Sequence, residues 1–144
     1  MKLTQLTLVI LLSLFTFLAF AEETPPISQQ ALLTLMATPA NKPLVLDVRS
    51  ADEFAEGHIA GAINISHDEI NANLSKIMAY KDQTVVVHCR SGRRAISAEN
   101  DLRAAGFSDL RHLDGDMNAW DTKNVLDMSS MFFGAAAYNG DLSS

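Results

Sequence analysis

The segment Thr84–His88 constrains the fold of this 144-residue chain more than any other part of the sequence. Its three central residues are all valine, so apolar and polar side chains do not alternate along it. A β-branched run of this kind is typical of a strand that is buried on both faces, as in a parallel sheet. We therefore expect an α/β fold with this strand in an open parallel sheet.

Further strand patterns occupy residues 44–46, 62–65 and 110–113, and helix patterns separate them. Alternation over about residues 44–120 predicts right-handed crossovers and helices on both faces of the sheet. Ligands of such sheets bind beyond the carboxyl ends of the strands. Cys89 directly follows the strand at 84–88, so it lies where a ligand is expected.

Capping residues and apolar spacing indicate where the helices begin. Ser28 is the expected N-cap of the first helix, whose apolar residues are Leu32, Leu33, Leu35 and Met36. Capping boxes of the form Ser-x-x-Glu at 50–53 and 66–69 open two more helices. The last helix stops at Gly106, and its apolar residues are Ala95, Ile96, Ala98, Leu102 and Ala105.

Residues 1–21 have the features of an export signal. Lys2 supplies a positive start, residues 6–20 form an uncharged apolar run, and Ala19-Phe20-Ala21 is a small-x-small cleavage site. An uncleaved anchor is the alternative, since a spanning helix needs ~20 apolar residues. We expect cleavage, a linker at 22–26 and export to the periplasm of a Gram-negative bacterium, with the cell surface or an inner-membrane anchor as alternatives.

Without the signal the chain is acidic. Lys2 is the only charged residue removed, which leaves 10 Lys and Arg against 17 Asp and Glu, a formal net charge of −7. This balance argues against nucleic acids or anionic membrane surfaces as partners. The remaining length suits one domain with a modest core.

Cys89 is the only cysteine of the chain. Exported proteins usually meet an oxidising compartment in which thiols are paired as disulfides. A lone thiol is most often buried and inert, but an unpaired one in an exported protein is also a candidate for reactivity or for an intermolecular disulfide. The residues around it must distinguish these alternatives.

The loop at residues 89–94 reads Cys-Arg-Ser-Gly-Arg-Arg. Backbone N–H groups of a tight turn can form an anion-binding nest, and the next helix adds its positive N-terminal end. This positive surrounding favours the thiolate of Cys89. Ser91 and Gly92 are expected to close the turn. The arginines either bind an anionic substrate or remain solvated charges; they are Arg90, Arg93 and Arg94.

The residues after Val-Val-Val-His strongly resemble the active-site loop of rhodanese-homology domains. Upstream, Leu-Asp-Val-Arg at 46–49, Glu-Phe at 53–54 and Gly-His-Ile-x-Gly-Ala-x-Asn-Ile at 57–65 resemble the N-terminal signature of the same family. The resemblance covers about residues 27–120, and a signal followed by one short domain is similar to the small periplasmic rhodaneses. It implies a rhodanese-like open parallel sheet and a thiosulfate sulfurtransferase that needs no cofactor.

In such an enzyme Cys89 takes the sulfane sulfur of a small anionic donor as a persulfide and passes it to cyanide or to a thiol acceptor, which is a small molecule or a protein. The resemblance implies that the loop N–H groups stabilise the persulfide and that the loop arginines hold the donor. Asp47 and Arg49, at a neighbouring strand end, are expected to brace the loop, and His58 to have a structural role. The histidines show no ligand spacing, so no metal is expected.

Two other functions remain open. Cysteine-dependent phosphatases and arsenate reductases use a Cys-x5-Arg loop, whereas Arg94 stands here at Cys-x4-Arg, a shorter loop that suits a single sulfur atom. A non-catalytic binding module is the other alternative, because many domains of this fold have lost their cysteine. Cys89 and all the loop arginines are present, which favours the enzyme.

The end of the chain departs from the family, which closes with Gly-Gly-x-x-x-Trp, whereas residues 115–120 read Gly-Asp-Met-Asn-Ala-Trp. Residues 121–144 then resemble one unit of a leucine-rich-type repeat of bacterial surface proteins. A solitary unit cannot bury its own apolar face. We expect a gene fusion or a repeat array that continues, with a short adhesive tail as the alternative and surface-repeat contacts through the tail. The apolar side chains that a solitary unit would leave exposed to solvent are Met128, Met131, Phe132, Phe133 and Tyr138.

Overall fold

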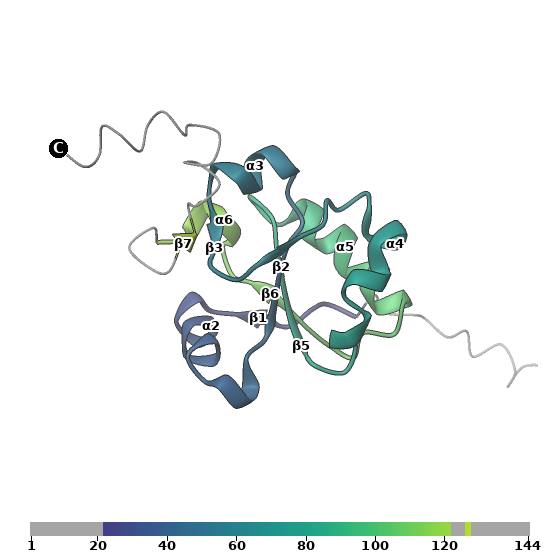
Figure 1. Cartoon of the computed structure of the whole chain (residues 1–144), viewed down its shortest axis with the longest axis horizontal. Coiled ribbons are helices and arrows are strands. Elements are labelled where there is room, and N and C mark those ends of the chain that lie inside the picture. Colours follow the sequence, from purple (N-terminus) through teal and green to yellow (C-terminus); the bar gives the residue numbers. More distant parts are fainter. Residues whose placement is uncertain (1–21, 122–125, 128–144) are drawn as a thin grey trace, which may run out of the picture.

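The computed structural model describes residues 22–121 and the backbone of residues 126–127. Five parallel strands form a sheet in the order β1-β6-β5-β2-β4 (Figure 1). The central strand is β5 (Thr84–His88), between β2 (Leu44–Asp47) and β6 (Asp109–Leu113), and the edges are β1 (Pro26–Ile27) and β4 (Ile63–Asn64). The predicted α/β fold with an open parallel sheet is confirmed.

Helices cover both faces of the sheet, and the alternation of side chains divides the core between them. Val45 and Val86 pack with Leu32 of α2 (Gln29–Met36). The residues that flank these valines along β2 and β5 pack on the opposite face, with α4 (Ile70–Asn73) and α5 (Arg93–Ala104). Figure 1 shows α2 on one side of the strands and α4 and α5 on the other. Because β5 is covered on both faces, its sequence has no polar alternation.

Two short helices stand at the carboxyl ends of the strands. The helix α3 (Ala51–Glu56) follows β2, and α6 (Asp116–Ala119) follows β6. Hydrogen bonds join both of them to the loop after β5. They therefore enclose the region in which the sequence places Cys89.

Two of the three predicted serine caps are confirmed. Ser28 accepts the N–H of Ala31, and Ser50 forms the full capping box with Glu53. The predicted cap at Ser66 is wrong. Its hydroxyl donates to Asp68 Oδ1 at 2.6 Å and its carbonyl accepts the N–H of Glu69, so Ser66 closes a turn, and the helix begins only at Ile70. Two short 3-10 turns, η2 (Leu74–Lys76) and η3 (Met78–Tyr80), complete this connection.

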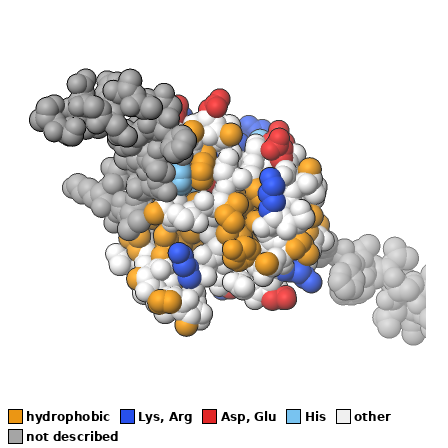
Figure 2. Space-filling model, viewed as in Figure 1, with side chains coloured by type: hydrophobic (Ala, Val, Ile, Leu, Met, Phe, Trp, Pro, Cys, Tyr) orange, Lys and Arg blue, Asp and Glu red, His pale blue; other side chains and the backbone are white. Residues whose placement is uncertain are grey.

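The helix α5 ends as the sequence predicts, with Gly106 at a φ of 92° directly after its C-cap. Its buried apolar residues are Ala95, Ala98 and Leu102. Ile96 does not belong to this face, because it is 56% exposed and with Met78 is one of the large hydrophobic side chains at the described surface. Figure 2 shows apolar side chains in the middle of the viewed face, with charged side chains of both signs scattered around them.

A second, two-stranded sheet pairs β3 (His58–Ile59) with β7 (Leu126–Asp127) in antiparallel register. At the other end of the chain, the predicted linker enters the sheet at Pro26. The predicted export signal and the apolar tail residues lie outside the described residues. Among the residues that the structure describes, no helix is long and apolar enough to cross a membrane.

Candidate active site

Cys89 lies at the carboxyl end of β5 and is only 1% exposed. Its sulfur accepts a hydrogen bond from the backbone N–H of Gly92 at 3.0 Å. The two residues are three positions apart, so the loop folds back over the sulfur. The thiol therefore faces a polar donor, unlike an inert thiol that has only apolar neighbours.

Gly92 makes this turn possible. It adopts a φ of 101°, a left-handed conformation that residues with a side chain rarely adopt, and α5 begins directly after it. A Cβ atom at this position would lie 3.0 Å from Asp116 Oδ2 and 3.4 Å from His112 Nε2. The predicted role of Gly92 as a turn residue thus has both a conformational and a steric reason.

The loop arginines occupy different environments. Arg94 donates two hydrogen bonds to Glu53, at 2.6 and 2.9 Å, and Arg90 Nε lies 3.3 Å from the same carboxylate. Arg93 and Ser91 are exposed, and within the described residues Arg93 has no ion pair. Two of the three arginines are thus held by α3.

These contacts shift both partners of the Glu53–Arg94 pair. Hydrogen bonds from Arg94 lower the pKa of Glu53 to about 2, although burial opposes the change. Hydrogen bonds to Glu53 raise the pKa of Arg94, and a smaller contribution comes from Cys89, whose side chain lies near this guanidinium. From the sequence, Glu53 is predicted to cap a helix and is part of the family signature, without a role at the cysteine loop. Its place in the motif gave no sign of a partner 41 residues away.

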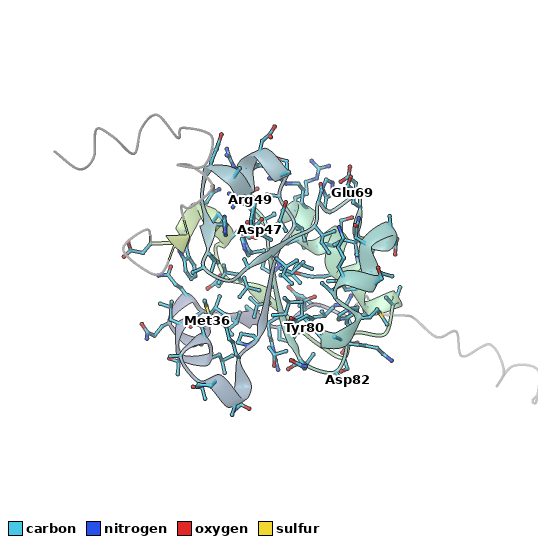
Figure 3. All side chains as sticks on the ribbon, viewed as in Figure 1. Met36, Asp47, Arg49, Glu69, Tyr80 and Asp82 are labelled. Atoms are coloured by element: carbon cyan, nitrogen blue, oxygen red, sulfur yellow. The ribbon has the colours of Figure 1, made fainter. Side chains whose placement is uncertain are left out.

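Asp47 and Arg49 form a buried ion pair at the end of β2, where Figure 3 shows them side by side. Asp47 accepts the backbone N–H and the side-chain Nε and Nη2 of Arg49, and Arg49 Nη2 also donates to the carbonyl of Gly57 at 2.9 Å. The ring of His88 lies 3.8 Å from Asp47. Burial lowers the pKa of His88, so this ring is neutral.

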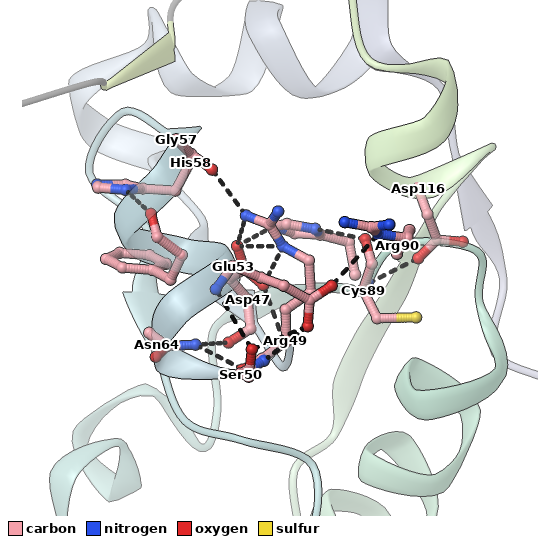
Figure 4. A network of polar contacts seen from close by, with 12 residues as sticks. Asp47, Arg49, Ser50, Glu53, Gly57, His58, Asn64, Cys89, Arg90 and Asp116 are labelled. Carbon is pink, nitrogen blue, oxygen red and sulfur yellow. Dashed lines mark hydrogen bonds and ion pairs between the residues drawn. The ribbon is translucent and has the colours of Figure 1, made fainter. Parts of the chain in front are cut away.

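His58 begins β3, two residues after the end of α3. Its ring stacks on Phe54 with 3.6 Å between the ring centroids, and its Nδ1 lies 2.9 Å from the Phe54 carbonyl. Asn64 ties the neighbouring segment to β2 by donating to the carbonyls of Asp47 and Arg49. Figure 4 shows this polar network extending from His58 toward Cys89.

A second network, which the sequence analysis did not predict, lies on the other side of Cys89. Asp116 Oδ1 accepts the backbone N–H of Cys89 at 2.7 Å, and its Oδ2 lies 3.1 Å from His112 Nε2. His112 Nδ1 in turn lies 2.5 Å from Glu99 Oε1 on α5. The backbone N–H of Met117 also donates to the Cys89 carbonyl, so α6 is fastened to the cysteine by two bonds.

The charges of this second network stabilise one another. Hydrogen bonds to Asp116 and then to Glu99 raise the pKa of His112 to about 10, so the ring is protonated at neutral pH. Burial by itself would raise the pKa of Asp116, but the hydrogen bonds from His112 and from the Cys89 amide together lower it. Asp116 is therefore a carboxylate that faces an imidazolium.

The sequence model of the rhodanese-like domain family matches residues 28–123. The chain belongs to this family. The matched residues of this rhodanese domain include four of the five strands of the parallel sheet, all but β1, and every site residue described above.

Two curated relatives show how far the similarity extends. The rhodanese domain is 36% identical over 91 residues to thiosulfate sulfurtransferase 16 of Arabidopsis thaliana, a chloroplastic protein; the match covers 56% of this chain and 75% of that protein. It is 36% identical over 83 residues to the protein YibN of Escherichia coli K12, where the match covers 57% of this chain but only 58% of that protein.

Among solved structures, the rhodanese-like domain protein from Staphylococcus aureus is similar to this chain with a TM-score of 0.63 and 27% identity. The match covers 73% of this chain and 98% of that one. This similarity supports the assignment of the rhodanese fold, including helices on both faces of the parallel sheet.

The described part of the rhodanese domain contains no group of three or more His, Cys, Asp or Glu side chains arranged to hold a metal ion. What the site does offer is a buried sulfur with a backbone N–H donor on one side and a guanidinium nearby. Such groups stabilise negative charge on sulfur. The chemistry that this arrangement supports is nucleophilic attack by Cys89.

Proposed function

We propose that this rhodanese domain is a sulfurtransferase that carries sulfane sulfur as a persulfide on Cys89. The observation that carries the proposal is the hydrogen bond from the Gly92 N–H to the Cys89 sulfur. It places the only thiol of the chain inside a loop that can bind a negatively charged sulfur. The name of the Arabidopsis relative, a thiosulfate sulfurtransferase, supports the same activity.

The proposed reaction has two displacement steps. The Cys89 thiolate attacks the outer sulfur of thiosulfate; a new S–S bond forms, the old one breaks, and sulfite leaves with the electron pair. An acceptor thiolate or cyanide then attacks the outer sulfur of the persulfide, and the Cys89 thiolate leaves. Sulfur is transferred without any external oxidant, reductant or cofactor.

Arg90, Arg93 and Arg94 are proposed to hold the anionic donor. Arg90 and Arg93 are exposed and can meet an ion from solvent. Arg94 lies near Cys89 but is already paired with Glu53, so it would stabilise charge close to the sulfur without leaving that partner. The buried pair of Asp47 and Arg49 would support the loop from β2 without touching the donor.

The alternatives are weaker for physical reasons. In a phosphatase or an arsenate reductase the Cys-x5-Arg loop must enclose a tetrahedral oxyanion, whereas the loop from Cys89 to Arg94 is one residue shorter. A binding module would have no use for an intact cysteine loop. We also propose, from the first 21 residues, that the enzyme is exported to the periplasm, where a small or protein thiol accepts the sulfur.

The test is sulfur transfer from thiosulfate to cyanide by residues 22–144, compared with Cys89→Ser. We expect turnover by the wild-type protein, and intact mass spectrometry should show one added sulfur after incubation with thiosulfate alone. Both signals should disappear in Cys89→Ser, which differs by a single atom. Reduced, folded wild-type protein that gives neither turnover nor adduct would contradict the proposal and favour a binding module.

A further inference from the structure

Asp116 occupies an unusual backbone position. Its φ is 51°, which makes it the only non-glycine residue with a positive φ among those that the structure describes. The resemblance to the family's Gly-Gly-x-x-x-Trp pattern leads one to expect glycine there. Aspartate tolerates the left-handed region better than most residues, but still at a cost in free energy. Contacts of the side chain must therefore hold it in place.

Those contacts connect it directly to the nucleophile loop. Oδ1 accepts the Cys89 N–H, and Oδ2 lies 3.1 Å from His112 Nε2 and would be 3.0 Å from a Cβ added at Gly92. The side chains of Asp116 and Glu99 are each only 4% exposed. A glycine at this position could make none of these contacts, and the Cys89 N–H would lack its partner.

The carboxylate also creates an electrostatic problem that His112 solves. The buried Asp116 carboxylate, which accepts the Cys89 N–H, would disfavour a second negative charge on the nearby sulfur. Protonated His112 lies between Asp116 and Glu99, so the three side chains carry one positive and two negative charges. The other charged or titratable groups facing the loop are Arg94 with Glu53, Arg90, and beyond the strand His88 with Asp47 and Arg49.

We propose that Asp116 is a positioning residue that holds the Cys89 backbone against α6, and that His112 offsets its charge so that the Cys89 thiolate can form. The inference rests on the proposed function only in taking Cys89 as the nucleophile. It concerns the state of the thiol before any sulfur donor binds, so it can be tested without sulfur transfer.

The experiment measures alkylation of Cys89 by iodoacetamide as a function of pH. The thiolate displaces iodide and forms a C–S bond, so the pH midpoint of the rate reports formation of the thiolate. His112→Gln leaves Asp116 and Glu99 without their cation, and we expect the midpoint to rise by about one pH unit or more. His67→Gln, the same replacement in the loop before α4, should leave the midpoint unchanged.

The double variant His112→Gln with Asp116→Asn provides the decisive comparison. Asparagine keeps an acceptor for the Cys89 N–H and tolerates the same backbone region. The double variant returns the network to one net negative charge, so the midpoint should return toward the wild-type value. A purely structural role predicts the opposite, since two lesions in one network would not repair each other.

Two results would overturn the proposal. One is an unchanged alkylation midpoint in folded His112→Gln. The other is a midpoint of the double variant that lies further from the wild-type value than that of His112→Gln. Should His112→Gln fail to fold, Asp116→Asn alone decides, because removing its negative charge must lower the midpoint. Absence of sulfur transfer by a wild-type protein with a normal alkylation profile would count against the proposed function but not against this inference.

Discussion

At the residue scale, Gly92 shows how one missing side chain shapes the site. Its N–H meets the Cys89 sulfur, and its left-handed φ lets the loop turn into α5. Gly61 has a comparable φ of 79°, but a Cβ there would meet nothing closer than Lys42 Nζ at 3.9 Å. A side chain at Gly61 would therefore cause backbone strain alone, whereas one at Gly92 would also clash with residues of the site.

We predict that Gly92→Ala lowers sulfur transfer by about 100-fold, since displacement of the loop misplaces both the sulfur and its donor. Gly61→Ala should leave activity unchanged while losing about 1 kcal/mol of unfolding free energy to backbone strain alone. Steady-state kinetics and urea denaturation measure the two effects. Equal activity in the two variants would show that the loop tolerates a Cβ.

Glu53 is a second residue with two roles, because it completes the capping box of α3 and also binds the distant Arg94. Its depressed pKa, about 2 against 4.5 in the unfolded chain, contributes stability above pH 4.5 that is lost as the pH falls toward 2. We predict that Glu53→Gln lowers the unfolding free energy at pH 7 by about 1 kcal/mol, allowing for solvent screening, and that the deficit shrinks at pH 3. Urea denaturation at both pH values tests this, with exposed Glu56→Gln as the control.

At the element scale, α3 and α4 show what a capping signature requires. Both carry a Ser-x-x-Glu pattern, yet only Ser50 caps its helix, whereas Ser66 lies in a turn that ends at Glu69, the N-cap of α4. A serine and an aspartate two residues later can stabilise a turn by their own hydrogen bond, so the pattern does not by itself fix where a helix begins. This local alternative explains why the second prediction was wrong.

The two serines give a matched pair of variants. We predict that Ser50→Ala destabilises the protein by about 1 kcal/mol and also loosens Glu53, since the serine both caps the helix and donates to that carboxylate. Ser66→Ala should change the unfolding free energy by less than about 0.5 kcal/mol, as expected for a surface position. Thermal denaturation distinguishes them, and equal losses would argue against the observed difference in capping.

At the scale of the whole molecule, two histidines with shifted pKa values limit stability on opposite sides of neutral pH. Burial lowers the pKa of His88, so stability falls below pH 6.5, where the unfolded chain takes up a proton that the folded one does not. His112 has the opposite sign. Its pKa is raised from 6.5 to about 10, so its contribution is complete below pH 6.5 and is lost as the pH rises toward 10.

We therefore predict that the unfolding free energy of the wild-type protein falls by roughly 2 kcal/mol between pH 7 and pH 10. His112→Gln should be less stable at pH 7, but its unfolding free energy should fall much less between pH 7 and pH 10, because it lacks the group that titrates there. Denaturant titrations at these pH values measure both limbs. An unchanged slope in the variant would mean that another group controls the alkaline side.

The sequence determined those features that depend on neighbouring residues. The unbroken valines of β5 indicated a strand covered on both faces, Ser50 and Glu53 marked the start of α3, and Gly106 marked the end of α5. The cysteine loop could likewise be found, because a thiol, a glycine and clustered arginines follow one strand directly. These signals involve residues close together in the chain, so they can be recognised without knowledge of the fold.

Only the tertiary structure decided which distant side chains meet at the cysteine. Crossovers bring Arg94 to Glu53 across 41 residues and Asp116 to the Cys89 amide across 27 residues. Neither partner carries a local signal for the other, and the protonation of His112 depends on two carboxylates from different elements. The candidate nucleophile could thus be named from sequence, whereas the charged groups around it depend on strand order in the sheet.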